Sequence, residues 1–539
     1  MSITLPPGSD RKYAVENASL DLNRGEILCV VGESGSGKSV MTSAILKDVP
    51  QRLSISSGEI LFNGNNILNF NEKKLNEIRG NRISMIYQEP MAALNPAMKI
   101  GFQLDEVFQL HRKEIKKEER KNESIILLNQ MQLPSPERIY DSYPHQISGG
   151  QCQRVVIAMA LACKPDILIA DEPTTALDVT TQKEILSLIN DLKNLYNNAT
   201  IFITHDFGVV ADVADRVLVM CDGKIIEQGL KKSILLKPKE DYTKLLVDAM
   251  PILKANRSPN VKRKDNPIVQ AKNIHKIYGK GKNKVHAVND ANFSLKKGET
   301  LGVVGESGSG KSTLAKTLIR LIEPTEGSVI INENEFLSLK NKDLQKARKQ
   351  IQMIFQDPYG SLNPTHTVGQ ILTRGQILRG VEEKKAIQDA FDLLKLVGLG
   401  RESFYRTPRN FSGGQRQRIG IARALSMYPD VVIADEAVSA LDLSVQKQVL
   451  RLINNLQKQF NIAIIFITHD LRVAAQISDY IAVMEKGIIV EFGTVKNVFN
   501  YPRHKYTKKL LDAAPGKTWN PPRLKPEIAE KIAQKLQKV

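Results

Sequence analysis

The chain has 539 residues, of which 42% are hydrophobic and 25% charged, a composition typical of soluble globular proteins with more than one domain. The net charge of 76−58=+18 fits solvated lysines, an anionic membrane surface or nucleic acid, and does not decide between them. The longest apolar run, Val155–Cys163, is about half of the ~18–20 residues of a membrane span. No signal-peptide pattern opens the chain, and Cys29, Cys152, Cys163 and Cys221 form no CxxC pair. We therefore expect a reducing compartment, and neither a disulfide framework nor a zinc site.

The first predicted elements are a short apolar strand, Ile27–Val31, the string GESGSGKS and a helix. The same string follows a second apolar strand, Thr300–Val304. This is the context of a phosphate-binding P-loop, in which glycines turn backbone N–H groups inward and the helix dipole favours the anion. The predicted nucleotide-binding residues are Gly32, Glu33, Ser34, Gly35, Ser36, Gly37, Lys38 and Ser39, and Gly305, Glu306, Ser307, Gly308, Ser309, Gly310, Lys311 and Ser312.

Further motifs repeat in the same order after each P-loop. QEPMAALNP starts at Gln88 and QDPYGSLNP at Gln356, and ISGGQ ends at Gln151 and FSGGQ at Gln415. The two SGGQ segments lie 415−151=264 residues apart, as do the acidic and histidine motifs that follow them. The sequence therefore predicts two copies of one nucleotide-binding domain rather than a short-period repeat.

Candidate catalytic groups follow apolar strands in both copies. The carboxylates of Asp171 and Asp435 are predicted to orient Mg²⁺ together with the hydroxyls of Ser39 and Ser312, while Lys38 and Lys311 reach the β/γ-phosphates. Because adjacent strand residues face opposite ways, the next residues can serve as general bases toward the attacking water. These general bases are Glu172 and Glu436.

Two polar side chains complete each predicted catalytic site. Gln88 and Gln356 carry amides that both donate and accept, which suits the sensing of Mg²⁺ and water. His205 and His469 end strands at equal distances from their glutamates (205−172=33, 469−436=33), which favours an imidazole near the γ-phosphate over a structural role.

Domain boundaries follow from the repeat. We expect a first domain at residues 1–251, an exposed proline-rich basic linker at 252–267, a second domain at 268–515 and a tail at 516–539. Strand-like and helical patterns alternate within each copy, which predicts an α/β fold with a mainly parallel sheet.

Two helical features are predicted outside the sheets. Residues 89–146 and 357–410 contain few strand patterns and indicate a helical subdomain in each copy. In the tail, Ile528, Ile532 and Leu536 recur at helical spacing, and we expect this amphipathic helix to pack on the second domain rather than bind a partner.

The ordered motifs resemble those of ATP-binding-cassette (ABC) ATPases over essentially the whole chain. The resemblance implies that ATP lies between the P-loop of one domain and the SGGQ signature of the other. The Lys38 site would then be completed by the second signature, and the Lys311 site by the first. The signature residues carried over are Ser412, Gly414 and Gln415, and Ser148, Gly150 and Gln151.

The ends of the domains refine this resemblance. EDYTKLLVDAMP (Glu240–Pro251) and HKYTKKLLDAAP (His504–Pro515), which we name the closing segments, are similar to those of oligopeptide and dipeptide import ATPases. A single chain with both ATPases resembles the fused subunits of peptide, glutathione and microcin C-type importers. The resemblance implies ATP and Mg²⁺ as cofactors and a peripheral position on the cytoplasmic face of the bacterial inner membrane. Two membrane-spanning permeases and a periplasmic substrate-binding protein are the implied partners, without nucleic acid.

A rival class is the tandem-cassette ATPase that acts on the ribosome or on nucleic acid. Such translation factors carry a long charged helical linker, and DNA-repair cassettes carry zinc-binding CxxC pairs. The short linker and the cysteine pattern of this chain favour the importer.

The two ATP sites are expected to differ at adenine. Tyr278 lies 311−278=33 residues before its P-loop lysine, where the family places an aromatic residue that stacks on adenine. The same distance in the first copy leads to Leu5, although Tyr13 could substitute. The opening strand of the first domain is also expected to be short.

Overall fold

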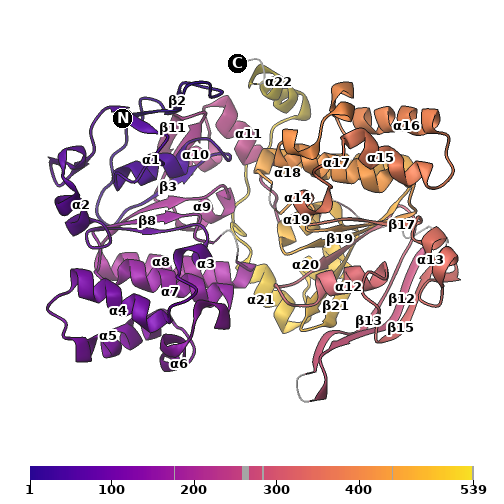
Figure 1. The fold of residues 1–539 in the computed structure, drawn as a ribbon, viewed down its shortest axis with the longest axis horizontal. Helices are drawn as coiled ribbons and strands as arrows, with labels where there is room; N and C mark the ends of the chain where they lie inside the picture. The colour runs from indigo at the N-terminus through magenta and orange to yellow at the C-terminus, as the bar shows by residue number, and fades with distance from the viewer. Residues whose placement is uncertain (175–176, 256, 258–265, 282–283, 440, 537–539) are drawn as a thin grey trace. The chain divides into compact units, whose positions relative to one another are not determined.

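The computed structural model describes residues 1–539 apart from 175–176, 256, 258–265, 282–283, 440 and 537–539. The chain divides into two compact units, which are Met1–Met250 with Thr518–Val539, and Pro251–Lys517. In each unit, helices cover both faces of a central sheet (Figure 1). The predicted α/β class is confirmed.

The central sheet of the first unit has the strand order β11-β10-β3-β9-β8-β7 among the described residues. All neighbours are parallel except β11, which is antiparallel to β10. Since helices cover both faces, the central strands are apolar along their length rather than alternating. The strands are β3 (Ile27–Val31), β7 (Ile83–Ile86), β8 (Ile167–Asp171), β9 (Ala199–Ile203), β10 (Arg216–Cys221) and β11 (Lys224–Leu230).

The second unit repeats this sheet, with the order β17-β18-β19-β14-β20-β21 in its described part. Here β21 is the antiparallel edge strand, paired with β20. The strands are β14 (Thr300–Val304), β17 (Ile351–Ile354), β18 (Val431–Asp435), β19 (Ala463–Thr468), β20 (Tyr480–Glu485) and β21 (Ile488–Thr494).

A smaller antiparallel sheet accompanies each central sheet, and the two differ in length. In the first unit, β1 (Ser2–Thr4) pairs with β2 (Tyr13–Val15) and with β4 (Ser54–Ser57). The corresponding opening strands of the second unit are much longer, since β1 has 3 residues and β12 has 10. The remaining strands of this kind are β12 (Val269–Tyr278), β13 (Val285–Leu295), β15 (Glu326–Ile331) and β16 (Asn334–Glu335), with a separate hairpin of β5 (Leu61–Phe62) and β6 (Asn65–Asn66).

The predicted helical subdomains are present in both units. In the first, α4, α5 and α6 pack on one another, and α3, α4 and α5 contact α7. In the second, α14, α15 and α16 contact α17. The helices of the first unit are α1 (Lys38–Ile45), α2 (Glu72–Ile78), α3 (Pro90–Ala93), α4 (Ile100–His111), α5 (Lys117–Gln130), α6 (Pro136–Asp141), α7 (Gly149–Leu161), α8 (Val179–Tyr196), α9 (Phe207–Val213), α10 (Lys231–Leu236), α11 (Asp241–Ala249) and α22 (Pro526–Leu536). Those of the second are α12 (Lys311–Leu318), α13 (Asn341–Ala347), α14 (Pro358–Ser361), α15 (Val368–Ile377), α16 (Glu383–Leu396), α17 (Gly413–Leu425), α18 (Leu443–Phe460), α19 (Leu471–Ile477), α20 (Val495–Asn500) and α21 (Lys505–Ala513).

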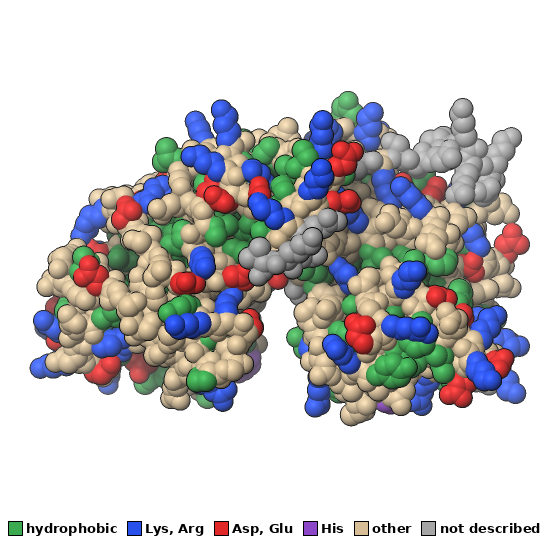
Figure 2. Space-filling model, turned by 90° about the horizontal axis from the view of Figure 1, so that it is seen from above, with side chains coloured by type: hydrophobic (Ala, Val, Ile, Leu, Met, Phe, Trp, Pro, Cys, Tyr) green, Lys and Arg blue, Asp and Glu red, His purple; other side chains and the backbone are tan. Residues whose placement is uncertain are grey.

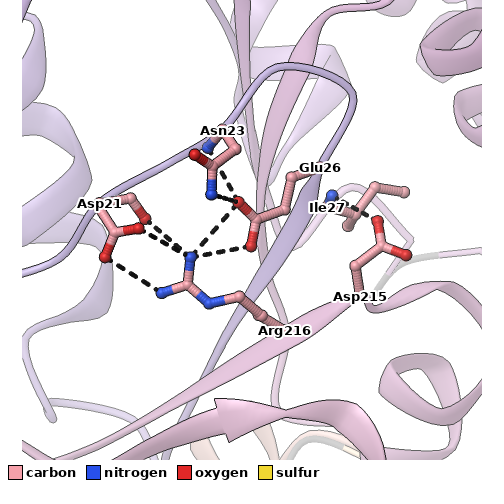
Figure 3. A network of polar contacts seen from close by, with 6 residues as sticks. All are labelled: Asp21, Asn23, Glu26, Ile27, Asp215 and Arg216. Carbon is pink, nitrogen blue, oxygen red and sulfur yellow. Dashed lines mark hydrogen bonds and ion pairs between the residues drawn. The ribbon is translucent and has the colours of Figure 1, made fainter.

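A polar network fixes the amino ends of β3 and β10 in the first unit (Figure 3). Arg216 donates to the carboxylates of Asp21 and Glu26 at 3.2 and 3.0 Å. Asp215 accepts the backbone N–H of Ile27 at 2.9 Å. These contacts align β3 with β10 at the edge of the sheet opposite the P-loop.

The linker is partly packed rather than exposed as predicted. Leu253 and Ala255 pack against a core cluster of the second unit. The guanidinium of Arg257 donates to Gln457 at 2.7 Å and to Thr300 at 3.2 Å. The sequence pattern missed this because a short segment without periodicity can still bury single side chains. Most of the remaining predicted linker lies outside the described residues.

The tail helix forms, but the prediction that it packs on the second domain was wrong. Residues 518–539 belong to the first unit, and α22 contacts α11. Lys535 pairs with Asp241 at 3.1 Å. Ile532 is buried at 8% exposure, whereas Ile528 remains 46% exposed. Fewer apolar residues of α22 are therefore buried than the predicted apolar stripe contains. The ion pair between Lys535 and Asp241 adds a contact that helical periodicity does not reveal.

On the face drawn in Figure 2, Lys and Arg of the described residues are scattered among acidic, apolar and other side chains. Among the helices that the structure describes, none has both the length and the apolar character needed to cross a membrane.

Candidate nucleotide-binding and catalytic sites

Each P-loop turns sharply where the strand passes into the helix. Gly37 and Gly310, which precede α1 and α12, have left-handed φ values of 98° and 101°. A Cβ would lie 2.5 Å from the Ala14 carbonyl oxygen at Gly37, and 2.1 Å from that of Ala287 at Gly310. Both positions therefore require glycine, and the turn brings the loop to the N-terminus of a helix, where an anion is favoured.

The P-loop lysines are buried within their own loops. Lys38 Nζ donates to the carbonyl oxygens of Gly32 and Glu33 at 2.9 and 2.8 Å and lies 3.4 Å from Ser36 Oγ. Lys311 makes the same three contacts at 2.8, 2.7 and 3.3 Å. Each ammonium is thus held against the loop expected to receive the phosphates.

A serine and an aspartate meet beside each lysine. Ser39 Oγ donates to Asp171 Oδ1 at 3.2 Å, and Ser312 Oγ donates to Asp435 Oδ1 at 3.1 Å. Burial raises the pKa of both carboxyls, and the serine hydrogen bonds act against this shift. Two hard oxygens side by side fit Mg²⁺, which is usually bound by few protein oxygens together with water and phosphate.

The two predicted general bases lie just beyond the ends of their strands, not within them as predicted. Strands β8 and β18 end at Asp171 and Asp435, so Glu172 and Glu436 lie beyond them. Both glutamates have left-handed φ values, 45° and 46°, which are uncommon for residues with a side chain. The backbone turn at each glutamate, rather than strand alternation, therefore directs its side chain away from that of the preceding aspartate. Strain of this kind is typical of functional positions.

In the first unit, three predicted catalytic side chains come together. Gln88 Nε2 donates to Glu172 Oε2 at 3.1 Å, and His205 Nδ1 lies 3.3 Å from Glu172 Oε1. Gln88 follows β7, Glu172 follows β8 and His205 follows β9, so neighbouring parallel strands deliver all three. The carboxylate is held at both oxygens.

The second unit forms the same cluster. Gln356 Nε2 donates to Glu436 Oε2 at 2.7 Å, and His469 Nδ1 lies 3.3 Å from Glu436 Oε1. The hydrogen bond from His469 lowers the pKa of Glu436 against the effect of burial. For His469, burial acts to lower the pKa, but the hydrogen bond and charge of Glu436 raise it overall. The pair therefore favours an ionised carboxylate, the form that a general base requires.

The signature residues lie at helix N-termini. Ser148 begins α7 with a capping box, because its Oγ accepts from Gln151 N at 3.3 Å and Gln151 Oε1 accepts from Ser148 N at 3.0 Å. Ser412 and Gln415 form the same box at α17 with the same distances. The two glutamines thus bond their own serines in this structure.

The signature glycines also permit close helix packing. A Cβ at Gly150 would lie 2.8 Å from Thr181 Cγ2, and one at Gly414 would lie 2.4 Å from Val445 Cγ1. Each glycine thus lets its signature helix approach the following long helix, α8 or α18.

This chain matches two known protein families. The ABC transporter family matches residues 15–175 and 288–439, and the family "Oligopeptide/dipeptide transporter, C-terminal region" matches 226–280 and 490–535. The glutathione import ATP-binding protein of Salmonella choleraesuis (strain SC-B67) is 44% identical over 93% of this chain and 86% of its own length. Its counterpart from Escherichia coli (strain K12) is 42% identical over 96% and 88%. A solved dimeric bacterial ABC transporter cassette aligns with 42% of this chain and 98% of its own at 28% identity and a TM-score of 0.39.

The chain belongs to the ABC transporter ATP-binding proteins of the oligopeptide/dipeptide class. It is a tandem-cassette ATPase. Both cassettes keep the P-loop, glutamine, signature, acidic and histidine motifs in order.

The cassettes differ where adenine is expected. Tyr278 ends β12, is 41% exposed, and pairs with Val285 of β13. In the first cassette, Leu5 N donates to Lys12 O at 3.0 Å, so Leu5 takes the place of Tyr278 on the shorter hairpin. Tyr13 pairs instead with Thr4 of β1.

Sequence reasoning missed three residues that touch the P-loops. Arg11 donates to Gly35 O at 2.5 Å. The hydroxyl oxygens of Tyr242 and Tyr506 accept backbone N–H groups of the two loops. The tyrosines could have been found, because both stand in the closing segments at the common offset (506−242=264). Arg11 lies in a hairpin without a recognisable motif and gave no such signal.

Proposed function

We propose that this ATPase powers the import of peptides, of the dipeptide, oligopeptide or glutathione-like class, across the bacterial inner membrane. The observation that carries the proposal is the oligopeptide/dipeptide C-terminal region, which matches once in each half of the chain. The named relatives are glutathione import proteins and support a thiol-containing tripeptide as one candidate cargo. Cargo passes through partner permeases and makes no contact with this chain.

At each site, we propose that Mg²⁺ binds together with ATP. Ser39 with Asp171, and Ser312 with Asp435, supply the oxygens that fit this ion. Gln88 and Gln356, which donate to the neighbouring glutamates, are proposed as its further ligands. The ion neutralises charge on the phosphates when bound. Glu172 and Glu436 accept the proton of the attacking water, and His205 and His469 hold these carboxylates in place.

Each ATP is proposed to lie between the P-loop of one cassette and the signature of the other. The N-termini of α7 and α17 support this, because the positive end of a helix dipole favours anionic oxygens. Lys38 would share its nucleotide with Ser412 and Gly414, and Lys311 with Ser148 and Gly150. ATP then holds the two cassettes together until it is hydrolysed.

The proposed partners are two membrane-spanning permeases and a periplasmic substrate-binding protein, with the chain bound peripherally to the cytoplasmic face of the inner membrane. The net charge of +18 is compatible with contact with anionic lipid. No nucleic acid partner is proposed.

Reconstitution tests this function. The chain is placed in proteoliposomes with the permeases and binding protein encoded beside its gene, and uptake of labelled glutathione, a dipeptide and a longer peptide is measured with ATP. ATP-dependent uptake of one of these cargoes supports the proposal. Uptake of none, together with ribosome binding that survives high salt, would favour the rival translation-factor class.

A further inference from the structure

The closing segments reach the P-loops of their own cassettes. The hydroxyl oxygen of Tyr242, in α11, accepts the backbone N–H of Glu33 at 3.2 Å. The hydroxyl oxygen of Tyr506, in α21, accepts the N–H of Glu306 at 3.0 Å. Glu33 and Glu306 are the second residues of the two GESGSGKS loops, so the same contact is made twice, by tyrosines 209 and 200 residues further along the chain.

The residue bonded by each tyrosine also bonds the P-loop lysine. Glu33 donates its N–H to Tyr242 and accepts Lys38 Nζ at its carbonyl oxygen at 2.8 Å. Glu306 likewise lies between Tyr506 and Lys311, whose Nζ is 2.7 Å from the Glu306 carbonyl oxygen. One residue therefore joins the closing segment to the lysine expected to bind the β/γ-phosphates.

The helices that carry the two tyrosines are anchored at their N-terminal ends. A carboxylate of the edge strand accepts the two N–H groups that precede each helix: Glu227 bonds Lys239 and Glu240, at 2.8 and 3.1 Å. In the second cassette, Glu491 takes the same role, bonding Arg503 and His504 at 2.9 and 3.1 Å.

The second tyrosine is also fixed by packing. Tyr506 is only 6% exposed and packs in a core cluster with Leu471 and Leu510. Burial raises the pKa of its hydroxyl, which therefore stays neutral and keeps its hydrogen bonds.

We propose that Tyr242 and Tyr506 are positioning residues that set the first turn of each P-loop, and with it the lysine, for ATP. The oligopeptide/dipeptide C-terminal region is thereby part of the nucleotide site of each cassette. This role rests on the ATPase activity and is independent of the cargo. Each tyrosine acts on the site of its own cassette.

Conservative variants separate positioning from folding. Tyr506→Phe and Tyr242→Phe remove only the hydroxyl and keep the packed ring. Each is made in the full chain with Lys38→Ala, so that only the second site binds nucleotide, and with Lys311→Ala, so that only the first does. Affinity for a fluorescent ATP analogue, KM and kcat for ATP, and Tm without nucleotide are measured.

In the Lys38→Ala background, Tyr506→Phe should weaken nucleotide binding and raise KM by about 2- to 10-fold, the range for losing one hydrogen bond. It should leave binding unchanged in the Lys311→Ala background, and Tyr242→Phe should show the reverse pattern. Tyr501→Phe is the matched control, since Tyr501 is 73% exposed just ahead of the same helix.

Two results would overturn the proposal. One is unchanged affinity with a lower Tm, which would make the tyrosines structural only. The other is an equal loss of affinity in both backgrounds, which would mean that the effect is not local. If Tyr506→Phe folds poorly, the half-buried Tyr242→Phe gives the same test at the first site.

Discussion

The phosphate ends of the two ATP sites match closely, whereas the ends expected to face adenine do not. The distance from serine to aspartate is 3.2 Å in one cassette and 3.1 Å in the other, and that from histidine to glutamate is 3.3 Å in both. On the opening hairpin, Leu5 stands where the second cassette has Tyr278. The proposed catalytic groups are thus arranged alike in both cassettes, whereas the residues expected near adenine differ.

A second difference lies beside the P-loop. Asp222 follows β10 and holds Arg11 at 3.2 Å, and Arg11 in turn bonds Gly35 O. The positions that match by register, Lys284 and Lys486, are both cationic and cannot form this ion pair with each other. Asp222 and Lys486 share the same left-handed backbone, with φ of 47° and 48°, so only the side chain has changed.

The largest expected effect tests the catalytic groups that are arranged alike in the two cassettes. Glu172→Gln with Glu436→Gln should lower ATP hydrolysis by roughly 10²–10⁴-fold, because the amide keeps the shape but takes no proton from water. ATP binding should persist, and the closed state with bound ATP should accumulate. Phosphate release and nucleotide binding are measured together. Glu530→Gln, at an exposed position on α22, serves as the control. Substantial hydrolysis by the double variant would contradict the assignment of both bases.

The next effect tests whether the cassettes share their nucleotides. Ser412→Arg should weaken nucleotide trapping at the Lys38 site by about 100-fold or more, because the bulky cation blocks the approach of the γ-phosphate in addition to the loss of one charge-assisted hydrogen bond, ~1.5–3 kcal/mol. Ser148→Arg should do the same at the Lys311 site. Ser412→Ala and Ser148→Ala are the matched controls, with smaller losses. The cross-cassette pairing is wrong if Ser412→Arg harms only the Lys311 site.

The difference at the adenine end predicts a smaller effect, on the ATP affinities of the two sites. Stacking on an aromatic ring contributes ~1–3 kcal/mol per base on nucleic-acid precedent, so the Lys38 site should bind ATP about tenfold more weakly than the Lys311 site. Titrations of Lys311→Ala and Lys38→Ala variants compare the surviving sites. Leu5→Tyr should strengthen the first site and Tyr278→Leu weaken the second. Equal affinities of the two surviving sites would contradict the prediction that only the second site stacks an aromatic ring on adenine.

The sequence predicted those features of the fold and of the sites that lie within short segments of the chain. Each P-loop, and each glutamate with its glutamine and histidine, lies at the end of a strand, and parallel strands bring such ends together at one edge. The contact of Tyr242 with Glu33 joins residues 209 positions apart, and that of Lys535 with Asp241 joins residues 294 apart. No local period encodes such contacts, because they depend on how finished elements pack. This is also why the tail helix was predicted correctly but its docking site was not.

The smallest effect tests the Arg11 contact, which is confined to the first cassette. Arg11 donates to the carbonyl oxygen of Gly35, and Gly223 N donates to that of Ser36 at 3.0 Å, so two carbonyls of this P-loop are held in place. In the Lys311→Ala background, Arg11→Met should weaken ATP binding by about threefold, as for one exposed hydrogen bond of ~0.5–1 kcal/mol. Asp222→Asn, which keeps Arg11 but loses the ion pair, should have a smaller effect. Lys284→Met in the Lys38→Ala background is the matched control, and an equal loss there would show that charge near the loop matters in both cassettes, rather than the bond to Gly35.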